Sequence, residues 1–212
     1  MARLKLLPMD TETGGLTPDK TLLTLYMCVV NEHFQVVDEL DLKLKPNDGK
    51  YNCDAQALKV NGINLEAHDK DPKTITYTEG AKLILSFLDK HHTGGRWPTL
   101  QPGGHNLPFD LGFVHHNLIP KEVWEKRCSY RILDTTPLCT FFKDIGKWPE
   151  KVGSLVSIVE FLGLKMRDAH NAKEDTLMWL DTYAEIVKRE KMLLTAGGTT
   201  STVADDLVLL EI

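Results

Sequence analysis

The chain has 212 residues, of which 42% are hydrophobic and 26% are charged, a composition typical of one sizeable globular α/β domain. Its formal charge of −5 at pH 7 argues against a protein that coats long nucleic acid through a large basic surface, but it does not exclude contact with a few phosphates. No apolar run approaches the roughly 18 residues of a membrane span. The four cysteines are widely spaced and form no Cys-x-x-Cys pair, so we expect reduced thiols, a cytoplasmic protein and no membrane contact.

The first quarter of the chain predicts three strands. Residues 4–9, 21–30 and 34–45 are rich in apolar and β-branched residues, and the third segment alternates apolar and polar positions. The turns between the segments are short, which favours an antiparallel arrangement of consecutive strands.

Helical periodicity dominates the rest of the chain. Asp54 and Ser154 are predicted helix caps, and Gly163 is a predicted helix stop. The predicted helices cover residues 54–60, 79–91, 108–117, 121–126, 137–145, 154–162 and 172–191, and two further strands cover residues 99–106 and 130–134. This order predicts an α/β fold in which a mixed five-stranded sheet, antiparallel in its first three strands, is flanked by helices.

We assign residues 1–192 to one domain and residues 193–212 to a flexible C-terminal tail. The tail is small and polar at first and then acidic and apolar, a composition that favours disorder. The alternative is a docking peptide for a polymerase or another replication partner.

Two carboxylates separated by one residue, Asp10 and Glu12, lie where the first predicted strand reaches a Gly-Gly pair. Side chains at i and i+2 of a strand share a face, so the two acids can share a divalent cation. The spacing alone is weak evidence, because 30 of the residues are acidic. The same spacing recurs at Glu39 and Asp41 and at Asp69 and Asp71.

Two later stretches also place acids at the ends of predicted elements. Asp110 lies at the start of a helix among apolar residues, where an acid also interacts favourably with the helix dipole. His170 lies in a loop five residues before the helical Asp175. Each stretch alone is explained as ordinary helix-end chemistry, but the three acidic stretches together form a pattern.

This pattern resembles the DnaQ-like DEDDh 3′→5′ exonucleases. The first motif of that family matches residues 10–16 (Asp-Thr-Glu-Thr-Gly-Gly-Leu), the second matches residues 105–110 (His-Asn-x-x-Phe-Asp), and the third matches His170 and Asp175. Residues 57–63 (Ala-Leu-Lys-Val-Asn-Gly-Ile) are similar to a further segment of the family. The resemblance covers most of the predicted domain, and it is far more specific for the family than for the substrate.

The resemblance implies an RNase H-like fold and a two-metal mechanism. Asp10, Glu12 and Asp175 would bind one Mg²⁺ or Mn²⁺ ion, and Asp10 and Asp110 would hold a second. Two such ions about 3.5 to 4 Å apart stabilise the attacking and leaving oxygens of an in-line displacement at phosphorus. His170 would be the general base that takes a proton from the attacking water.

The same resemblance implies contacts with the 3′-terminal nucleotide from Thr13, Gly14, Leu16 and Asn106. For Leu16, ordinary core packing is an equally good interpretation. The leading hypothesis is a metal-dependent 3′→5′ exonuclease that releases nucleoside 5′-monophosphates from 3′ ends of single-stranded DNA, in proofreading or repair. The alternatives are an exoribonuclease that trims RNA or degrades oligoribonucleotides, and a non-catalytic module that binds nucleic acid or a polymerase.

Overall fold

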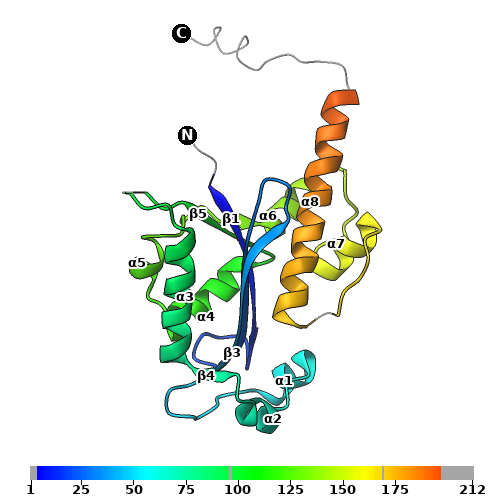
Figure 1. Cartoon of the computed structure of the whole chain (residues 1–212). Helices are drawn as coiled ribbons and strands as arrows, with labels where there is room; N and C mark the ends of the chain where they lie inside the picture. The colour runs from blue at the N-terminus through cyan, green and yellow to red at the C-terminus, as the bar shows by residue number, and fades with distance from the viewer. Residues whose placement is uncertain (1–3, 96, 169, 197–212) are drawn as a thin grey trace, which may run out of the picture.

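A mixed β-sheet between two layers of helices forms the body of the protein (Figure 1). The structure is a computed structural model that describes residues 4–95, 97–168 and 170–196. The sheet contains β1 (Lys5–Thr13), β2 (Leu22–Val30), β3 (Val36–Lys45), β4 (Thr74–Thr76), β5 (Leu100–Gly104) and β6 (Leu133–Asp134) in the order β4-β3-β2-β1-β5-β6. The first three strands are antiparallel, and β4, β5 and β6 each pair in parallel with a neighbour.

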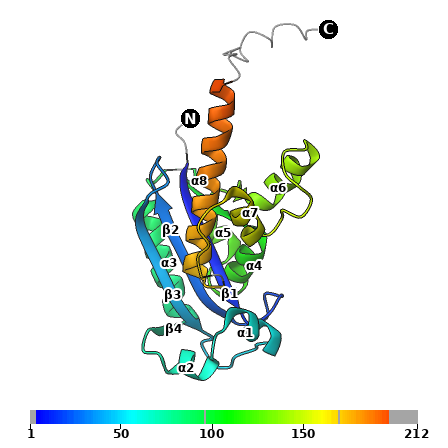
Figure 2. The same cartoon turned by 90° about the vertical axis from the view of Figure 1, so that its right-hand side faces the viewer.

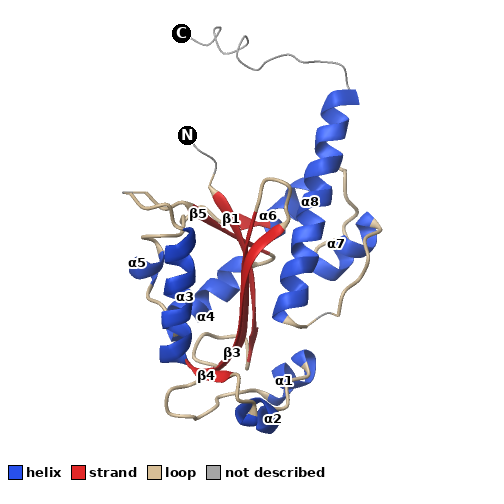
Figure 3. Cartoon of the chain, in the orientation of Figure 1, coloured by secondary structure: helices blue, strands red, loops and turns tan. Residues whose placement is uncertain are grey.

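Eight helices surround the sheet in the described part of the chain. They are α1 (Ala55–Asn61), α2 (Leu65–Lys70), α3 (Tyr77–His91), α4 (Leu107–Asn117), α5 (Lys121–Trp124), α6 (Thr135–Asp144), α7 (Leu155–Leu162) and α8 (Ala172–Ala196). Helices α3, α4 and α5 lie on one side of the sheet, and α6, α7 and α8 lie on the other (Figure 3). Figure 2 shows α8 running along the sheet face.

The central strand β1 divides its side chains between two cores. Leu7 and Met9 point into the larger core with α3 and α4, whereas Leu6 packs with Trp179 and Leu180 of α8. Because strand side chains alternate, Asp10 and Glu12 follow Leu6 onto the α8 side, and Thr11 follows Met9 toward α4. This alternation determines which helix each acid can meet.

The expected mixed sheet with three antiparallel leading strands is confirmed, with one strand more than expected. The extra strand, β4, has three residues at the edge beside β3. The sequence analysis also missed α2. Pro8, which cannot donate a ladder hydrogen bond, nevertheless stays in the strand opposite Gly103 of β5.

Most predicted helix boundaries agree with the structure to within a few residues. Ser154 caps α7 and Gly163 ends it in the left-handed conformation, both as predicted. The prediction for Asp54 was wrong in detail: it occupies the cap position of α1 without a side-chain cap bond, and its carboxylate pairs with Lys20 at 2.6 Å instead. Helix α8 is longer than predicted and includes residues 193–196 of the assigned tail, whereas residues 197–212 lie outside the described residues.

Three of the cysteines, Cys28, Cys128 and Cys139, are buried and free, and Cys53 is half-buried and free. Within the described residues, no helix combines the length and apolar character that a membrane crossing requires.

Candidate active site

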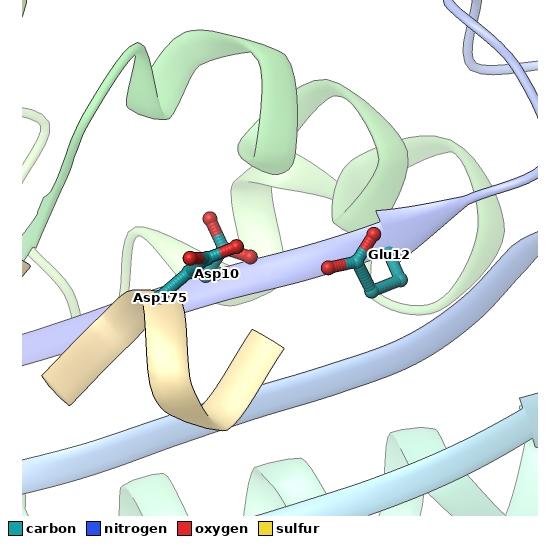
Figure 4. A group of neighbouring side chains, drawn as sticks. All are labelled: Asp10, Glu12 and Asp175. Carbon is teal, nitrogen blue, oxygen red and sulfur yellow. The ribbon is translucent and has the colours of Figure 1, made fainter. Parts of the chain in front are cut away.

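Three carboxylates from β1 and α8 converge on one side of the sheet. One carboxylate oxygen from each of Asp10, Glu12 and Asp175 lies within 4.8 Å of the other two. Figure 4 shows Asp175 reaching from the first turn of α8 toward Asp10, with the carboxylate of Glu12 farther along β1 turned toward both. The arrangement follows from strand alternation on β1 and from the packing of α8 on the face that carries the two acids.

Burial and mutual repulsion make these acids difficult to ionise together. Burial raises the pKa of Asp10 well above its usual value, and the charges of Asp110, Asp175 and Glu12 raise it further. Burial, followed by the charges of Asp175 and Asp110, raises the pKa of Glu12 to about 8. Burial also raises the pKa of Asp175. A cluster in this state gains from any cation that its oxygens can share.

Asp110 approaches β1 from α4, on the opposite side from α8. It lies outside the 4.8 Å group and is almost fully buried. Its Oδ1 accepts the backbone N–H of Thr11 at 2.9 Å and the Thr11 hydroxyl at 2.6 Å. Burial raises the pKa of Asp110 to about 7, although the two bonds from Thr11 act in the opposite direction. The structure therefore brings three of the four predicted acids together and holds the fourth beside them.

His170 is exposed and has a left-handed backbone, with φ of 66°. Its backbone N–H donates to Oδ2 of Asp175 at 3.0 Å, which fixes the loop to the first turn of α8. The next residue, Asn171, caps that helix, because its side-chain oxygen accepts the N–H groups of Lys173 and Glu174 at 3.1 and 3.3 Å. The predicted base thus lies beside the predicted third acid.

The predicted substrate contacts lie at the end of β1, in the loop after it, and at the start of α4. Thr13 is buried, and its hydroxyl donates to the Gly15 carbonyl at 2.7 Å. Leu16 is 83% exposed, so the core-packing interpretation was wrong. Asn106 is exposed with φ of 59°, and its N–H donates to Asp134 at 2.9 Å and to Thr136 at 3.0 Å.

Gly14 serves packing within the protein. A Cβ added at Gly14 would lie 2.4 Å from Sγ of Cys53, so the glycine allows residues 52–54 to approach the end of β1. The backbone confirms this approach, because the Asp54 N–H donates to the Gly14 carbonyl at 2.7 Å. The glycine that the sequence analysis connected to substrate approach is required here by the fold itself.

A cleft of about 400 Å³ opens beside the acids and reaches to α1 and α2. Its lining includes Glu12 and His170 together with Asn61 and Ile63. Asn61 also donates its side-chain amide to the Thr13 carbonyl at 3.1 Å. The segment that resembled a family motif at residues 57–63 therefore joins the acidic cluster through the end of β1.

Three residues that contribute to the site were missed by the sequence analysis. Thr11 binds Asp110, and its alternating position between two acids was a signal for a contact on the opposite face of the strand. Trp179 and Thr135 are hydrogen-bonded to each other behind the site. Trp179 lies four residues after Asp175 and hence on the same helix face, and this spacing was a signal for it. No neighbouring sequence feature identified Thr135.

Solved structures of exonuclease I match this fold over most of the chain. Zinc-bound E. coli exonuclease I in complex with single-stranded DNA matches 92% of this chain with a TM-score of 0.70 and 20% sequence identity. A further exonuclease I structure matches 92% with a TM-score of 0.72 and 19% identity. The exonuclease I of Methylocaldum szegediense matches 91% with a TM-score of 0.71 and 16% identity. The chain shares its fold with exonuclease I.

The match covers only part of exonuclease I. This chain spans 43% of the zinc-bound E. coli chain and 42% of the Methylocaldum szegediense chain, less than half of either protein. The RNase H-like fold expected from the motifs is thereby confirmed. No protein-family model and no curated protein sequence matches the chain.

Proposed function

We propose that this protein is a metal-dependent 3′→5′ exonuclease that hydrolyses the terminal phosphodiester bond of single-stranded DNA and releases nucleoside 5′-monophosphates. One observation carries the proposal: the convergence of Asp10, Glu12 and Asp175 within 4.8 Å of one another in a fold shared with exonuclease I. A non-catalytic binding module gains nothing from three such acids, where burial and then the charges of neighbouring carboxylates raise the pKa values of Asp10 and Glu12.

The donor set fits hard divalent cations. Carboxylate oxygens are the ligands that Mg²⁺ and Mn²⁺ prefer, and a shared cation offsets the burial and the repulsion that raise the pKa values of Asp10 and Glu12. Asp10, Glu12 and Asp175 would hold one ion, and Asp10 with Asp110 would hold the second. When bound, the ions supply charge stabilisation to the attacking and leaving oxygens of an in-line displacement.

His170 is the proposed general base. His170 is exposed and lines the same cleft as Glu12, and its backbone bond to Asp175 keeps the loop beside the acids. An imidazole can take the proton from the attacking water, a role that typically contributes about 10²- to 10⁴-fold in rate.

A DNA 3′ end is the proposed substrate. Single-stranded DNA is the ligand in the E. coli exonuclease I complexes with this fold. The net charge of −5 favours contact with a few terminal nucleotides over a long tract. The residues proposed to contact the terminal nucleotide are Thr13, Gly14, Leu16 and Asn106. A polymerase or another replication partner is a further proposal, which the assay below does not test.

An end-degradation assay tests the proposal. DNA and RNA oligomers of one sequence, labelled at the 5′ end, are incubated with Mg²⁺ or Mn²⁺, with and without a chelator, and the released products are separated. We expect chelator-sensitive shortening of DNA from the 3′ end, release of 5′-monophosphates and loss of activity in Asp10→Asn. Asp48→Asn, in an exposed loop acid remote from the cluster, is the matched control.

Each other outcome identifies one of the alternatives. Equal or preferential shortening of RNA would replace the DNA exonuclease by an RNA-trimming enzyme. No chelator-sensitive degradation of any 3′ end would favour the non-catalytic module.

A further inference from the structure

A buried chain of hydrogen bonds lies behind the acidic cluster. The indole N–H of Trp179 donates to Oγ1 of Thr135 at 3.2 Å, and the same Oγ1 lies 2.9 Å from Nδ1 of His105. A backbone group of Gly153 hydrogen-bonds the imidazole as well. Thr135 and Trp179 are each 1% exposed, so water does not replace these bonds.

The Thr135 hydroxyl has three polar partners. It accepts the indole N–H of Trp179, it donates to the Gly104 carbonyl at 3.5 Å, and it is hydrogen-bonded to Nδ1 of His105, where the donor depends on the tautomer of the ring. Burial lowers the pKa of His105, and the backbone bond with Gly153 acts in the opposite direction. One oxygen of Thr135 therefore joins α8 to the segment just before α4.

This chain of hydrogen bonds connects α8, which carries Asp175, with the start of α4, which carries Asp110. Trp179 lies one turn after Asp175 on α8, and His105 lies just before α4, which carries Asp110. The indole ring also rests on β5, where a Cβ added at Gly103 would lie 2.5 Å from Cη2 of Trp179. The contact of Trp179 with Gly103 and its hydrogen bond to Thr135 therefore fix the position of α8 along the sheet.

We propose that Thr135 is a positioning residue for the metal site: its hydroxyl fixes α8 relative to the start of α4, so that Asp175 and Asp110 face Asp10 from opposite sides of β1. This inference rests on the proposed function for its catalytic meaning. Its test depends on cation binding, which can be measured in the absence of nucleic acid.

The decisive variant is Thr135→Val in the full chain, which removes the hydroxyl at nearly constant volume. Binding of Mn²⁺ alone is measured by calorimetry. Groups that orient metal ligands typically contribute about 10- to 100-fold in metal affinity, and we expect the Mn²⁺ Kd to rise about 10-fold. Thr135→Ser restores the hydroxyl and should restore the Kd to within about 2-fold of the wild type.

Thr182→Val is the matched control. Thr182, on α8, is likewise a buried threonine, with 0% exposure, but its hydroxyl has no hydrogen-bond partner among the described residues. The same substitution there should leave the Mn²⁺ Kd unchanged.

Two results would overturn the inference. One is a Thr135→Val protein that loses thermal stability in chelator but keeps the wild-type Mn²⁺ Kd. The other is a Thr182→Val protein that loses as much Mn²⁺ affinity as Thr135→Val. If Thr135→Val does not fold, Trp179→Phe keeps a ring against Gly103 and deletes the N–H, and an unchanged Kd in that variant overturns the inference equally.

The same experiment separates this inference from the proposed function. A wild-type protein that binds Mn²⁺ but degrades no nucleic acid contradicts the function alone. A wild-type protein that degrades DNA, with a Thr135→Val variant of unchanged Mn²⁺ affinity, contradicts the positioning role alone. Absence of any Mn²⁺ binding by the wild type contradicts both.

Discussion

Thr11 donates both its backbone N–H and its hydroxyl to a single oxygen of Asp110, at 2.9 and 2.6 Å. One oxygen of Asp110 thus joins α4 to β1, and the other is the oxygen proposed to bind a metal ion. Asp110 therefore combines a structural role with its proposed catalytic one, and a substitution must separate the two.

Asp110→Asn separates them. An asparagine can keep the oxygen that accepts both bonds from Thr11 but removes the buried charge. We expect nuclease activity to fall about 100-fold or more, as for loss of groups that control metal binding, and the melting temperature in chelator to stay unchanged or rise. Asp110→Ala leaves the buried donors of Thr11 unpaired and should cost about 1–3 kcal/mol of stability. Thermal unfolding in EDTA and the DNA assay are measured for both variants. An active Asp110→Asn enzyme would exclude the metal-ligand role.

The stability of the metal-free protein should fall as pH rises. The pKa of Glu12 is raised to about 8, so between about pH 4.5 and 8 the folded state binds more protons than the unfolded chain, and the free energy of unfolding decreases across that interval. Asp10 and Asp175, whose pKa values are also raised, act in the same direction.

Melting temperatures in EDTA at pH 5 and pH 8.5 measure this effect. Since about 1 kcal/mol moves the melting temperature of a chain of this size by about 2–4 °C, we expect a fall of roughly 5 °C and a recovery on addition of Mn²⁺ at the higher pH. Glu12→Gln should flatten the dependence. A stability that rises over the interval in the absence of metal would contradict the electrostatic account of the cluster.

His170→Asn tests the proposed base without disturbing its backbone. Asparagine tolerates the left-handed conformation that His170 adopts, and the bond from the backbone N–H to Asp175 does not depend on the side chain. We expect the rate to fall about 10²- to 10⁴-fold with the Mn²⁺ Kd unchanged. His33→Asn, in an exposed turn, is the control. Unchanged turnover in His170→Asn would remove the imidazole from the mechanism.

The sequence predicted the parts of the fold that local chemistry determines. The acids of β1, the cap of α7 at Ser154 and the stop at Gly163 each depend on neighbours within a few residues. By contrast, β4 exists because Thr74–Thr76 pairs with β3, and no pattern within three residues encodes such a pairing.

The sequence motifs predicted which acids lie in the candidate site, but they did not predict the hydrogen bonds and ion pairs around it. Asp54 was expected to cap a helix, but its carboxylate pairs with Lys20, 34 positions away, in the folded chain. The bond between Thr11 and Asp110 spans 99 positions. A sequence motif gives the residue types that chemistry requires, whereas the contacts that hold them in place arise only when distant elements pack.

Leu16 provides the most direct test of where the 3′ end binds. An apolar side chain that is 83% exposed contributes little to folding, so Leu16→Ala should leave the melting temperature unchanged. If the terminal base covers this side chain, the lost burial is worth about 1.5 kcal/mol, and we expect KM for a DNA oligomer to rise about 10-fold with a smaller change in kcat. Val37→Ala, at an exposed valine of β3, controls for a general loss of surface apolarity. An equal KM for Leu16→Ala and the wild type would move the terminal nucleotide away from the loop after β1, while leaving the acids and His170 as the proposed catalytic groups.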